Sequence, residues 1–326
     1  MTEKGLTIFA HSRTLTVVMF IIATAMCIVA LSQGSIPEFS HEDRAIFTSP
    51  DRWIAGSGLS FAINILIYAA SAVALSFFCN NYNPFRLSSS VSATLFLVFI
   101  LGIPSVIERF YSGTYILGIV VLCIILTLSE YQDKSKMRRV FLTFFILSTA
   151  SLADYTILLY VPVFILGTAQ MRIFSGRTIV AILLGLITPF WILGGFGVLN
   201  DITLRLPQME SIFKSFSSQE VVPFIVAGVI IFFFSVLLLM ANFIKLVGYN
   251  ARIRSANGLM TVTLFATLVY TVIDYSNLPT YLPLMMWGAA FQAGHLIMSR
   301  NGQRTYLAVA GIVLLFLYLF IWNIAV

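Results

Sequence analysis

Long runs of apolar residues, separated by short polar segments, recur along the whole chain. Reading each run between its polar flanks yields eleven segments of 14 to 24 residues. They cover residues 14–32, 55–78, 91–107, 114–128, 140–153, 155–169, 178–199, 222–243, 259–273, 284–298 and 306–325. A helix crosses the hydrocarbon core of a membrane with roughly 20 apolar residues. The pattern therefore predicts an all-α protein, a polytopic bundle of about eleven transmembrane helices.

The stretch from Ser129 to Arg177 decides how neighbouring segments connect. About 32 largely apolar residues, 140–171, lie between two basic clusters, a length too great for one crossing and short for two. Because basic flanks favour the cytoplasmic side, the run is predicted to be a short hairpin with Asp154 near its tip. The preceding hairpin, 91–128, is equally short. Arms of 14 to 17 residues reach roughly 21 to 26 Å, so both tips are predicted to lie beneath the outer surface.

The distribution of charge orients the bundle. If the N-terminus is inside and the C-terminus outside, 14 of the 19 Lys and Arg but only three of the 13 acidic residues fall inside, a net charge of +11. The remaining five basic and ten acidic residues leave −5 outside. This asymmetry is the positive-inside pattern of cytoplasmic loops. The overall charge of +6 is thus a sign of topology, and no nucleic-acid partner is predicted.

Composition excludes an ordinary soluble fold. Apolar residues make up 59% of the chain and charged residues 10%, against roughly 25% charged residues in soluble domains, and the mean hydropathy is +0.96. The long apolar runs also differ from the alternating pattern of membrane barrels. No long polar segment interrupts them, so residues 1–326 are predicted to form a single integral membrane domain. The first run exceeds the apolar core of a signal peptide and is predicted to remain as an anchor helix.

Two outer segments carry helix signals of their own. In the acidic segment 33–54, Ser35 and Glu38 have capping-box spacing, which predicts a short helix that continues to about Phe47. Asp51 is then expected to cap the second crossing. In segment 200–221, apolar residues recur at helical spacing, which predicts an amphipathic helix in the outer interface.

A few ionisable residues lie at the predicted tips. Glu108 and Arg109 occupy the tip of one hairpin and Asp154 that of the next. Ionisable groups at such depth usually face water or protein and mark functional sites. Each also has a structural interpretation, an ion pair for Glu108 and Arg109 and a helix cap for Asp154. Asp274 is interpreted as part of a solvated outer turn.

The tenth apolar segment carries Gly288, Gln292 and His295 on one face, which is typical of tight packing between membrane helices. His11 and His41 lie in other parts of the chain. Neither the histidines nor the three cysteines have the spacing of a metal site. No metal or cofactor is therefore predicted, and phosphate-binding loops and serine nucleophile motifs are absent from the sequence.

The first outer loop reads PEFSHEDR, residues 37–44, directly after the first apolar run. With the number of crossings, it resembles the multi-spanning glycosyltransferases that use polyprenyl-phosphate sugars, the GT-C type. In that superfamily an acid in the first outer loop acts as catalytic base. The resemblance implies Glu42 or Asp43 as the base, with Glu38 as second choice.

Other polar residues complete the predicted outer site. Asp154 is a further catalytic candidate, and arginines can hold a phosphate by paired hydrogen bonds. The candidate substrate-binding residues are Glu38, His41, Arg44, Glu108 and Arg109. The middle of the chain, with NNYNPFR, RRVFLTFF and LLGLITPFW, is also similar to uncharacterised multi-pass inner-membrane proteins of Gram-negative bacteria.

Three hypotheses of function stay open. The first is an inner-membrane protein that acts on a lipid-linked glycan at the periplasmic face, with membrane lipids and a polyprenyl-phosphate-linked sugar as partners. The second is a non-catalytic scaffold subunit of an envelope complex. The third is an ion or small-solute transporter whose path is lined by outer acids, because short or broken spans are common at transport sites.

Overall fold

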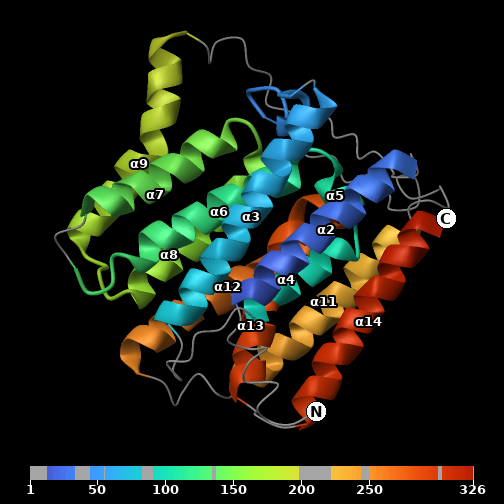
Figure 1. Cartoon of the computed structure of the whole chain (residues 1–326). Helices are drawn as coiled ribbons and strands as arrows, with labels where there is room; N and C mark the ends of the chain where they lie inside the picture. Colours follow the sequence, from blue (N-terminus) through green and yellow to red (C-terminus); the bar gives the residue numbers. More distant parts are fainter. Residues whose placement is uncertain are drawn as a thin grey trace.

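The computed structural model describes residues 13–33, 45–54, 56–82, 91–133, 137–197, 222–243, 250–299 and 303–325. Over these ranges every regular element is a helix and none is a strand (Figure 1). The prediction of an all-α fold is confirmed. Each of the eleven apolar runs is helical, because a chain in an apolar surrounding must satisfy its backbone groups internally.

The main helices follow the order of the apolar runs. They are α2 (Arg13–Gln33), α3 (Ser57–Asn81), α4 (Val91–Leu101), α5 (Ser105–Glu108), α6 (Ser112–Leu128), α7 (Met137–Ser151), α8 (Val161–Gln170), α9 (Gly176–Gly195), α11 (Val222–Phe243), α12 (Ala251–Ile273), α13 (Leu278–Ser299) and α14 (Gln303–Ala325). Short 3₁₀ helices are η1 (Pro50–Arg52), η2 (Tyr155–Tyr160) and η6 (Tyr275–Asn277).

Two predicted segments are interrupted, and proline explains both. The third run breaks between α4 and α5, where Pro104 has no N–H to continue the α-helix and disfavours helical backbone at the residue before it. The sixth begins as the 3₁₀ helix η2 before α8, and Pro162 lacks the N–H that an α-helix would donate to Leu158.

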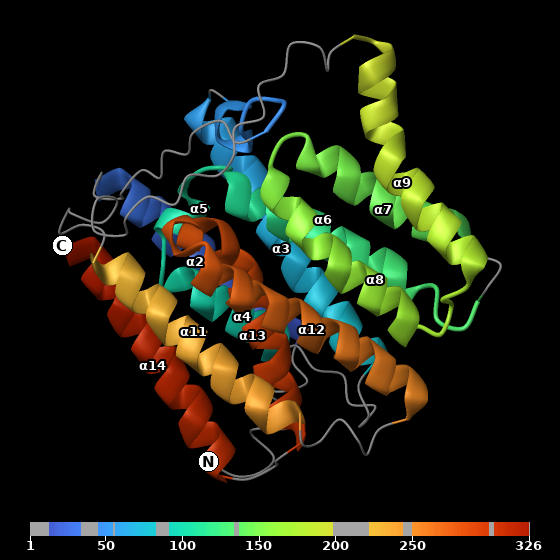
Figure 2. The ribbon, with the colours of Figure 1, turned by 180° about the vertical axis from the view of Figure 1, so that it is seen from behind.

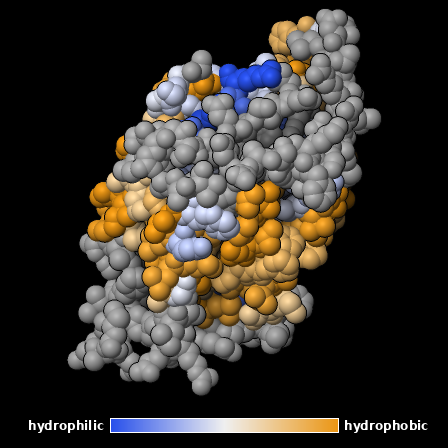
Figure 3. Space-filling model, turned by 90° about the vertical axis from the view of Figure 1, so that its right-hand side faces the viewer, coloured by the Kyte–Doolittle hydropathy of each residue, from blue (hydrophilic) through white to orange (hydrophobic). Residues whose placement is uncertain are grey.

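Four helices are long and apolar enough to cross a membrane: Ser57–Asn81, Gly176–Gly195, Ile225–Asn242 and Ala251–Ile273. Shorter apolar helices accompany them. Figure 3 shows that apolar residues dominate the described surface in that view, with the most hydrophilic atoms at its upper edge. Such a surface suits lipid rather than water, so the chain has the character of a helical membrane protein.

The centre of the bundle is formed by α13, α4 and α6, while α9 and α14 lie at opposite sides (Figures 1 and 2). Every residue of α4 is buried. From α13, Trp287 packs edge to face on Phe78 at 6.0 Å between ring centroids and donates its indole N–H to Ser71 O at 3.0 Å. Both contacts join α13 to α3.

The stretch from Ser129 to Arg177 folds back on itself, as the sequence predicts. Its helix α7 ends at Ser151 and η2 starts at Tyr155. At the other end of the hairpin, the N–H of Gln132 donates to Met171 O at 3.1 Å. Asp154 therefore lies at the turn, opposite the basic flanks.

Candidate functional site

Five of the eight candidate site residues lie outside the described residues: Glu38, His41, Glu42, Asp43 and Arg44. The predicted interfacial helix at 200–221 lies outside them as well. The description of the first outer loop begins at Ala45, and residues 45–48 are not helical. The prediction that the short helix of this loop continues to Phe47 is therefore wrong.

The last part of this loop, residues 45–54, packs on the ends of α6 and α7. The N–H of Phe47 donates to Leu152 O at 2.8 Å. Farther along, Asp51 accepts hydrogen bonds from Ser49 Oγ at 2.6 Å and from the backbone N–H of Ser112 at 3.1 Å. The contacts fix the loop over the turn that contains Asp154.

Asp51 caps a different helix from the predicted one. The second crossing, α3, begins after Gly56 and receives no side-chain cap from Asp51. The Asp51 carboxylate instead accepts hydrogen bonds from the backbone N–H and the hydroxyl of Ser112, the first residue of α6. A carboxylate favours that position because the helix N-terminus carries unpaired N–H groups and partial positive charge.

Asp154 is almost completely buried, with 1% of its surface exposed. Its Oδ1 accepts from the Thr156 N–H at 3.0 Å and from the Thr156 hydroxyl at 2.6 Å. These bonds make Asp154 the N-cap of η2, which is the structural interpretation considered from the sequence. Near it, the Tyr115 hydroxyl donates to Ala150 O at 3.4 Å and lies within electrostatic range of Asp154.

Asp274 is half-buried in a hydrogen-bonded turn rather than fully solvated. The Asn277 amide donates to its two oxygens at 2.6 and 2.7 Å, and the Tyr281 hydroxyl donates at 3.0 Å. Tyr281 also lies within electrostatic range of Asp154. The structure thus joins a buried tyrosine to Asp274 by a direct hydrogen bond. Tyr281 lies in the predicted turn between the ninth and tenth apolar runs, where a tyrosine gives no sequence signal of this role.

Glu108 and Arg109 lie at the same end of the bundle and are half-buried. The side-chain amide of Asn64, on α3, donates to the carbonyl oxygens of Ile107 at 2.8 Å and Arg109 at 2.9 Å. Phe110 N–H donates to Ser60 Oγ at 2.8 Å. Helix α3 therefore holds this tip in place.

Tyr111 follows directly, between α5 and α6. Burial raises the pKa of the Tyr111 hydroxyl well above its usual value, and nearby Tyr68 and Asp51 raise it further. The hydroxyl stays protonated at neutral pH, so Tyr111 is unsuited to act as a general base.

The polar face of the tenth run packs tightly, as predicted. A Cβ on Gly288 would meet Leu264 Cδ1 at 2.9 Å. The Asn242 amide donates to Gln292 Oε1 at 2.6 Å, and Gln292 donates to the Thr261 hydroxyl at 3.1 Å. This chain of bonds joins α11, α13 and α12. His295 is buried beside it.

Comparison of the chain with protein-family models, with curated proteins and with solved structures finds no match. The two resemblances described from the sequence therefore stay predictions.

Proposed function

We propose that the chain crosses the bacterial inner membrane eleven times, with the N-terminus in the cytoplasm and the C-terminus in the periplasm. Contacts between helix ends support this arrangement. Predicted inside ends contact one another through Tyr82 and Leu128 and through Gln132 and Met171. Predicted outside ends contact one another through Phe47 and Leu152 and through Asp51 and Ser112.

Two ends of α3 test the orientation. Ser57 and Asn81 are both exposed and bound this helix of 25 residues, which is about 38 Å long. In a chain without its three native cysteines, Ser57→Cys is expected to react with a membrane-impermeant maleimide on intact cells. Asn81→Cys is expected to react only after permeabilisation. The reverse pattern would contradict the proposed orientation.

We propose further that the outer end acts on a lipid-linked glycan, with Glu42 or Asp43 as the base. One observation carries this proposal: residues 45–54, which follow the acidic loop, pack over the hairpin tip that contains Asp154. Asp43 precedes Phe47 by four residues, which limits their Cα separation to about 14 Å. Chain connectivity thus keeps the predicted base close to the outer tips.

The proposed chemistry follows from the residue types. A carboxylate accepts the proton of an acceptor hydroxyl, whose oxygen then forms a bond to the anomeric carbon of the sugar. The bond between that carbon and the phosphate oxygen breaks, and polyprenyl phosphate leaves with the electron pair. Arg44 and Arg109 are the proposed partners of the phosphate. Asp154 contributes by holding the tip, since its carboxylate is engaged as a cap.

Replacing the proposed base tests this function. In cells, Glu42→Gln combined with Asp43→Asn is expected to raise the pool of unused polyprenyl-phosphate-linked sugar to the level of a deletion strain, because the acceptor is no longer deprotonated. Lipid extracts analysed by mass spectrometry measure that pool. Glu3→Gln, in the predicted cytoplasmic segment, is the matched control and should leave it unchanged. An unchanged pool in the double variant, with normal protein abundance, would end the proposal.

A scaffold role is the second candidate, and one observation favours it. All three outer aspartates within the described residues, Asp51, Asp154 and Asp274, already accept hydrogen bonds from the protein itself. A scaffold is expected to copurify with an envelope partner in constant ratio and to keep its cellular role in the Glu42 and Asp43 double variant.

A further inference from the structure

Trp53, in the loop 45–54, is half exposed and yet held in one position. Its exposed fraction is 46%. The indole N–H donates to Thr48 O at 2.8 Å. The indole ring packs at 73° to the ring of Tyr115, with 5.2 Å between ring centroids, and its centroid lies 6.3 Å from that of Phe110. The loop therefore presents an aromatic surface on a fixed side chain.

The two rings beneath Trp53 are fixed as well. Phe110 is buried, and its N–H donates to Ser60 Oγ, on α3, at 2.8 Å. The Tyr115 ring meets Phe110 edge to face, with 6.4 Å between centroids and 82° between planes, and its hydroxyl donates to Ala150 O, on α7. Three helices thus support the indole from below, which keeps its orientation.

A carboxylate lies next to the indole on the same side of α6. Asp51 accepts a hydrogen bond from the N–H of Ser112, and Trp53 packs on Tyr115. Ser112 and Tyr115 are three residues apart on α6, so they share a face of this helix. The Asp51 carboxylate and the indole are therefore about one helical turn apart, roughly 5 Å.

Asp51 can accept a further hydrogen bond. Its Oδ1 accepts from the Ser112 N–H, and its Oδ2 accepts from the hydroxyls of Ser49 and Ser112. A carboxylate has about four acceptor positions, so one position at Oδ1 is available to a ligand, and Asp51 is only half-buried. Thr48, whose carbonyl holds the indole, is exposed and adds a hydroxyl that both donates and accepts.

A role of Trp53 as a membrane anchor fits these contacts less well. Tryptophans of the aromatic belt lie at the level of the lipid head groups, with the apolar body of the ring toward the lipid. Here the N–H is bonded to the loop itself, and the two residues before Trp53 in its 3₁₀ helix are the ionisable Asp51 and Arg52. The neighbourhood of the ring is therefore polar, and water reaches it.

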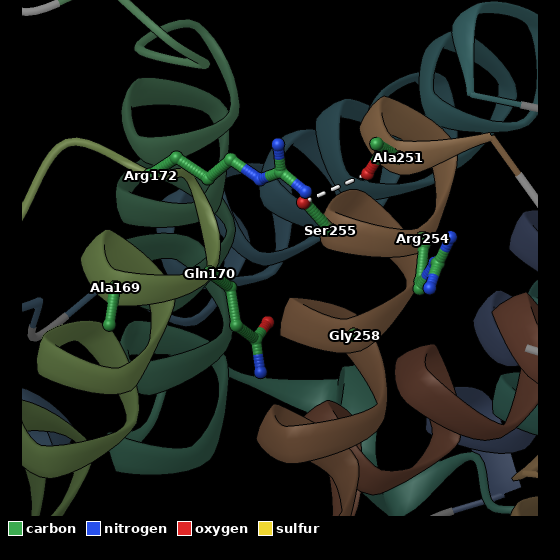
Figure 4. A pocket seen from close by; sticks show the side chains of 7 residues that line it. All are labelled: Ala169, Gln170, Arg172, Ala251, Arg254, Ser255 and Gly258. Atoms are coloured by element: carbon green, nitrogen blue, oxygen red, sulfur yellow. Dashed lines mark hydrogen bonds between the residues drawn. The ribbon is translucent and has the colours of Figure 1, made fainter. Parts of the chain in front are cut away.

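The pocket at the opposite end of the bundle offers no comparable arrangement (Figure 4). It lies between α8 and α12 and has a volume of about 440 Å³. Its arginines, Arg172 and Arg254, lie on different sides of α12, and Arg254 already has an interaction within the protein. Gln170 Oε1 is closed off against Gly258, where a Cβ would meet it at 2.9 Å. The polar groups of this pocket therefore do not converge on a ligand.

An aromatic surface beside hydroxyl-binding groups fits a pyranose ring. One side of such a ring presents mainly C–H bonds, which are attracted to the negative face of an aromatic system. The hydroxyls at its edge are donors, and a carboxylate is a strong acceptor for them. The width of a pyranose ring is similar to the one helical turn between the indole and the carboxylate.

We propose that Trp53 and Asp51 bind a pyranose ring of the lipid-linked glycan, with the ring stacked on the indole and one of its hydroxyls donating to Asp51 Oδ1. The inference rests on the proposed function for the nature of its ligand. Trp53 and Asp51 position the sugar and take no part in making or breaking its bonds.

Fluorine NMR of the purified full chain tests the proposal. The four tryptophans are replaced by 5-fluorotryptophan, and the Trp53 signal is assigned by its absence in Trp53→Phe. Farnesyl phosphate linked to glucose, to N-acetylglucosamine or to N-acetylgalactosamine is then added in detergent. At least one of these probes should shift the Trp53 signal in a saturable manner, whereas farnesyl phosphate without a sugar should leave it in place.

Variants separate stacking from folding. Trp53→Ala is expected to bind the responding probe about tenfold more weakly, because the stacking surface is lost, and Trp53→Phe should bind within about threefold of wild type, because it keeps a ring. Trp191→Ala is the matched control, since Trp191 is 76% exposed on α9, and it should bind as wild type does. Circular dichroism confirms that each variant is folded.

The outcomes also distinguish this proposal from the proposed function. A Trp53 shift that needs the sugar, together with an unchanged glycan pool in the Glu42 and Asp43 double variant, keeps the sugar site and removes the proposed catalysis. No shift with any of the three probes, an equal shift with farnesyl phosphate alone, or unchanged binding in folded Trp53→Ala would overturn the sugar site, whatever the pool does.

Discussion

Replacing Asp154 by leucine is expected to lower the free energy of unfolding by about 3 kcal/mol. The carboxylate is buried and accepts hydrogen bonds from the N–H and hydroxyl of Thr156. Leucine would leave both donors buried without a partner, which costs roughly 1 to 3 kcal/mol for each group, and would remove the cap of η2. Unfolding of the purified protein in mixed micelles, followed by circular dichroism, measures the loss.

Two milder variants separate the contributions. Asp154→Asn keeps an acceptor at Oδ1 and should cost about 1 kcal/mol, since only the charge assistance is lost. Thr156→Val removes the hydroxyl and leaves the backbone bond, with a loss of similar size. If Asp154→Leu unfolds at the same denaturant concentration as wild type, the capping role of Asp154 is wrong. If Asp154→Asn abolishes glycan turnover at unchanged stability, Asp154 belongs to the chemistry as well.

Replacing Gly185 by alanine is expected to destabilise the protein by roughly 2 to 3 kcal/mol. Helices α7 and α9 lie close together here. A Cβ on Gly185 would meet Phe141 O at 2.7 Å and Phe145 N at 3.1 Å, both backbone atoms of α7. Because backbone cannot turn aside as a flexible side chain can, the two helices must separate. The Ser148 hydroxyl bond to Leu186 O, now 2.6 Å, should lengthen with them.

The same helix supplies the control. At Gly195 a Cβ would meet nothing within 4 Å, so Gly195→Ala should change stability by no more than about 1 kcal/mol, the intrinsic preference of alanine over glycine in a helix. Thermal unfolding of the two variants in one detergent compares them directly. Equal unfolding temperatures would mean that α7 and α9 do not pack as closely as the structure has them.

Hydrophobic pattern alone was enough to locate the helices. The eleven apolar runs agree with helices in the structure, and the fold-back of residues 129–177 follows from its length and basic flanks. Pro104 and Pro162 mark the two interruptions, and both are visible in the sequence. The largest differences are at the starts of α12 and α13, which begin eight and six residues before the predicted runs 259–273 and 284–298.

The candidate site was harder to predict. The sequence assigned Asp154, Glu108 and Arg109 to one end of the bundle, and the structure places all three at the same end. It did not indicate Tyr281, which donates to Asp274.

The sequence by itself determined where the apolar helices lie along the chain and the asymmetry of charge between their predicted ends. These properties depend on neighbours along the chain, because the free energy of transferring a segment from water to an apolar phase is the sum of the contributions of its own residues. Only the tertiary structure decided that Asp51 caps α6. Asp51 and Ser112 are 61 positions apart along the chain, and their contact arises from the packing of whole helices rather than from any local pattern.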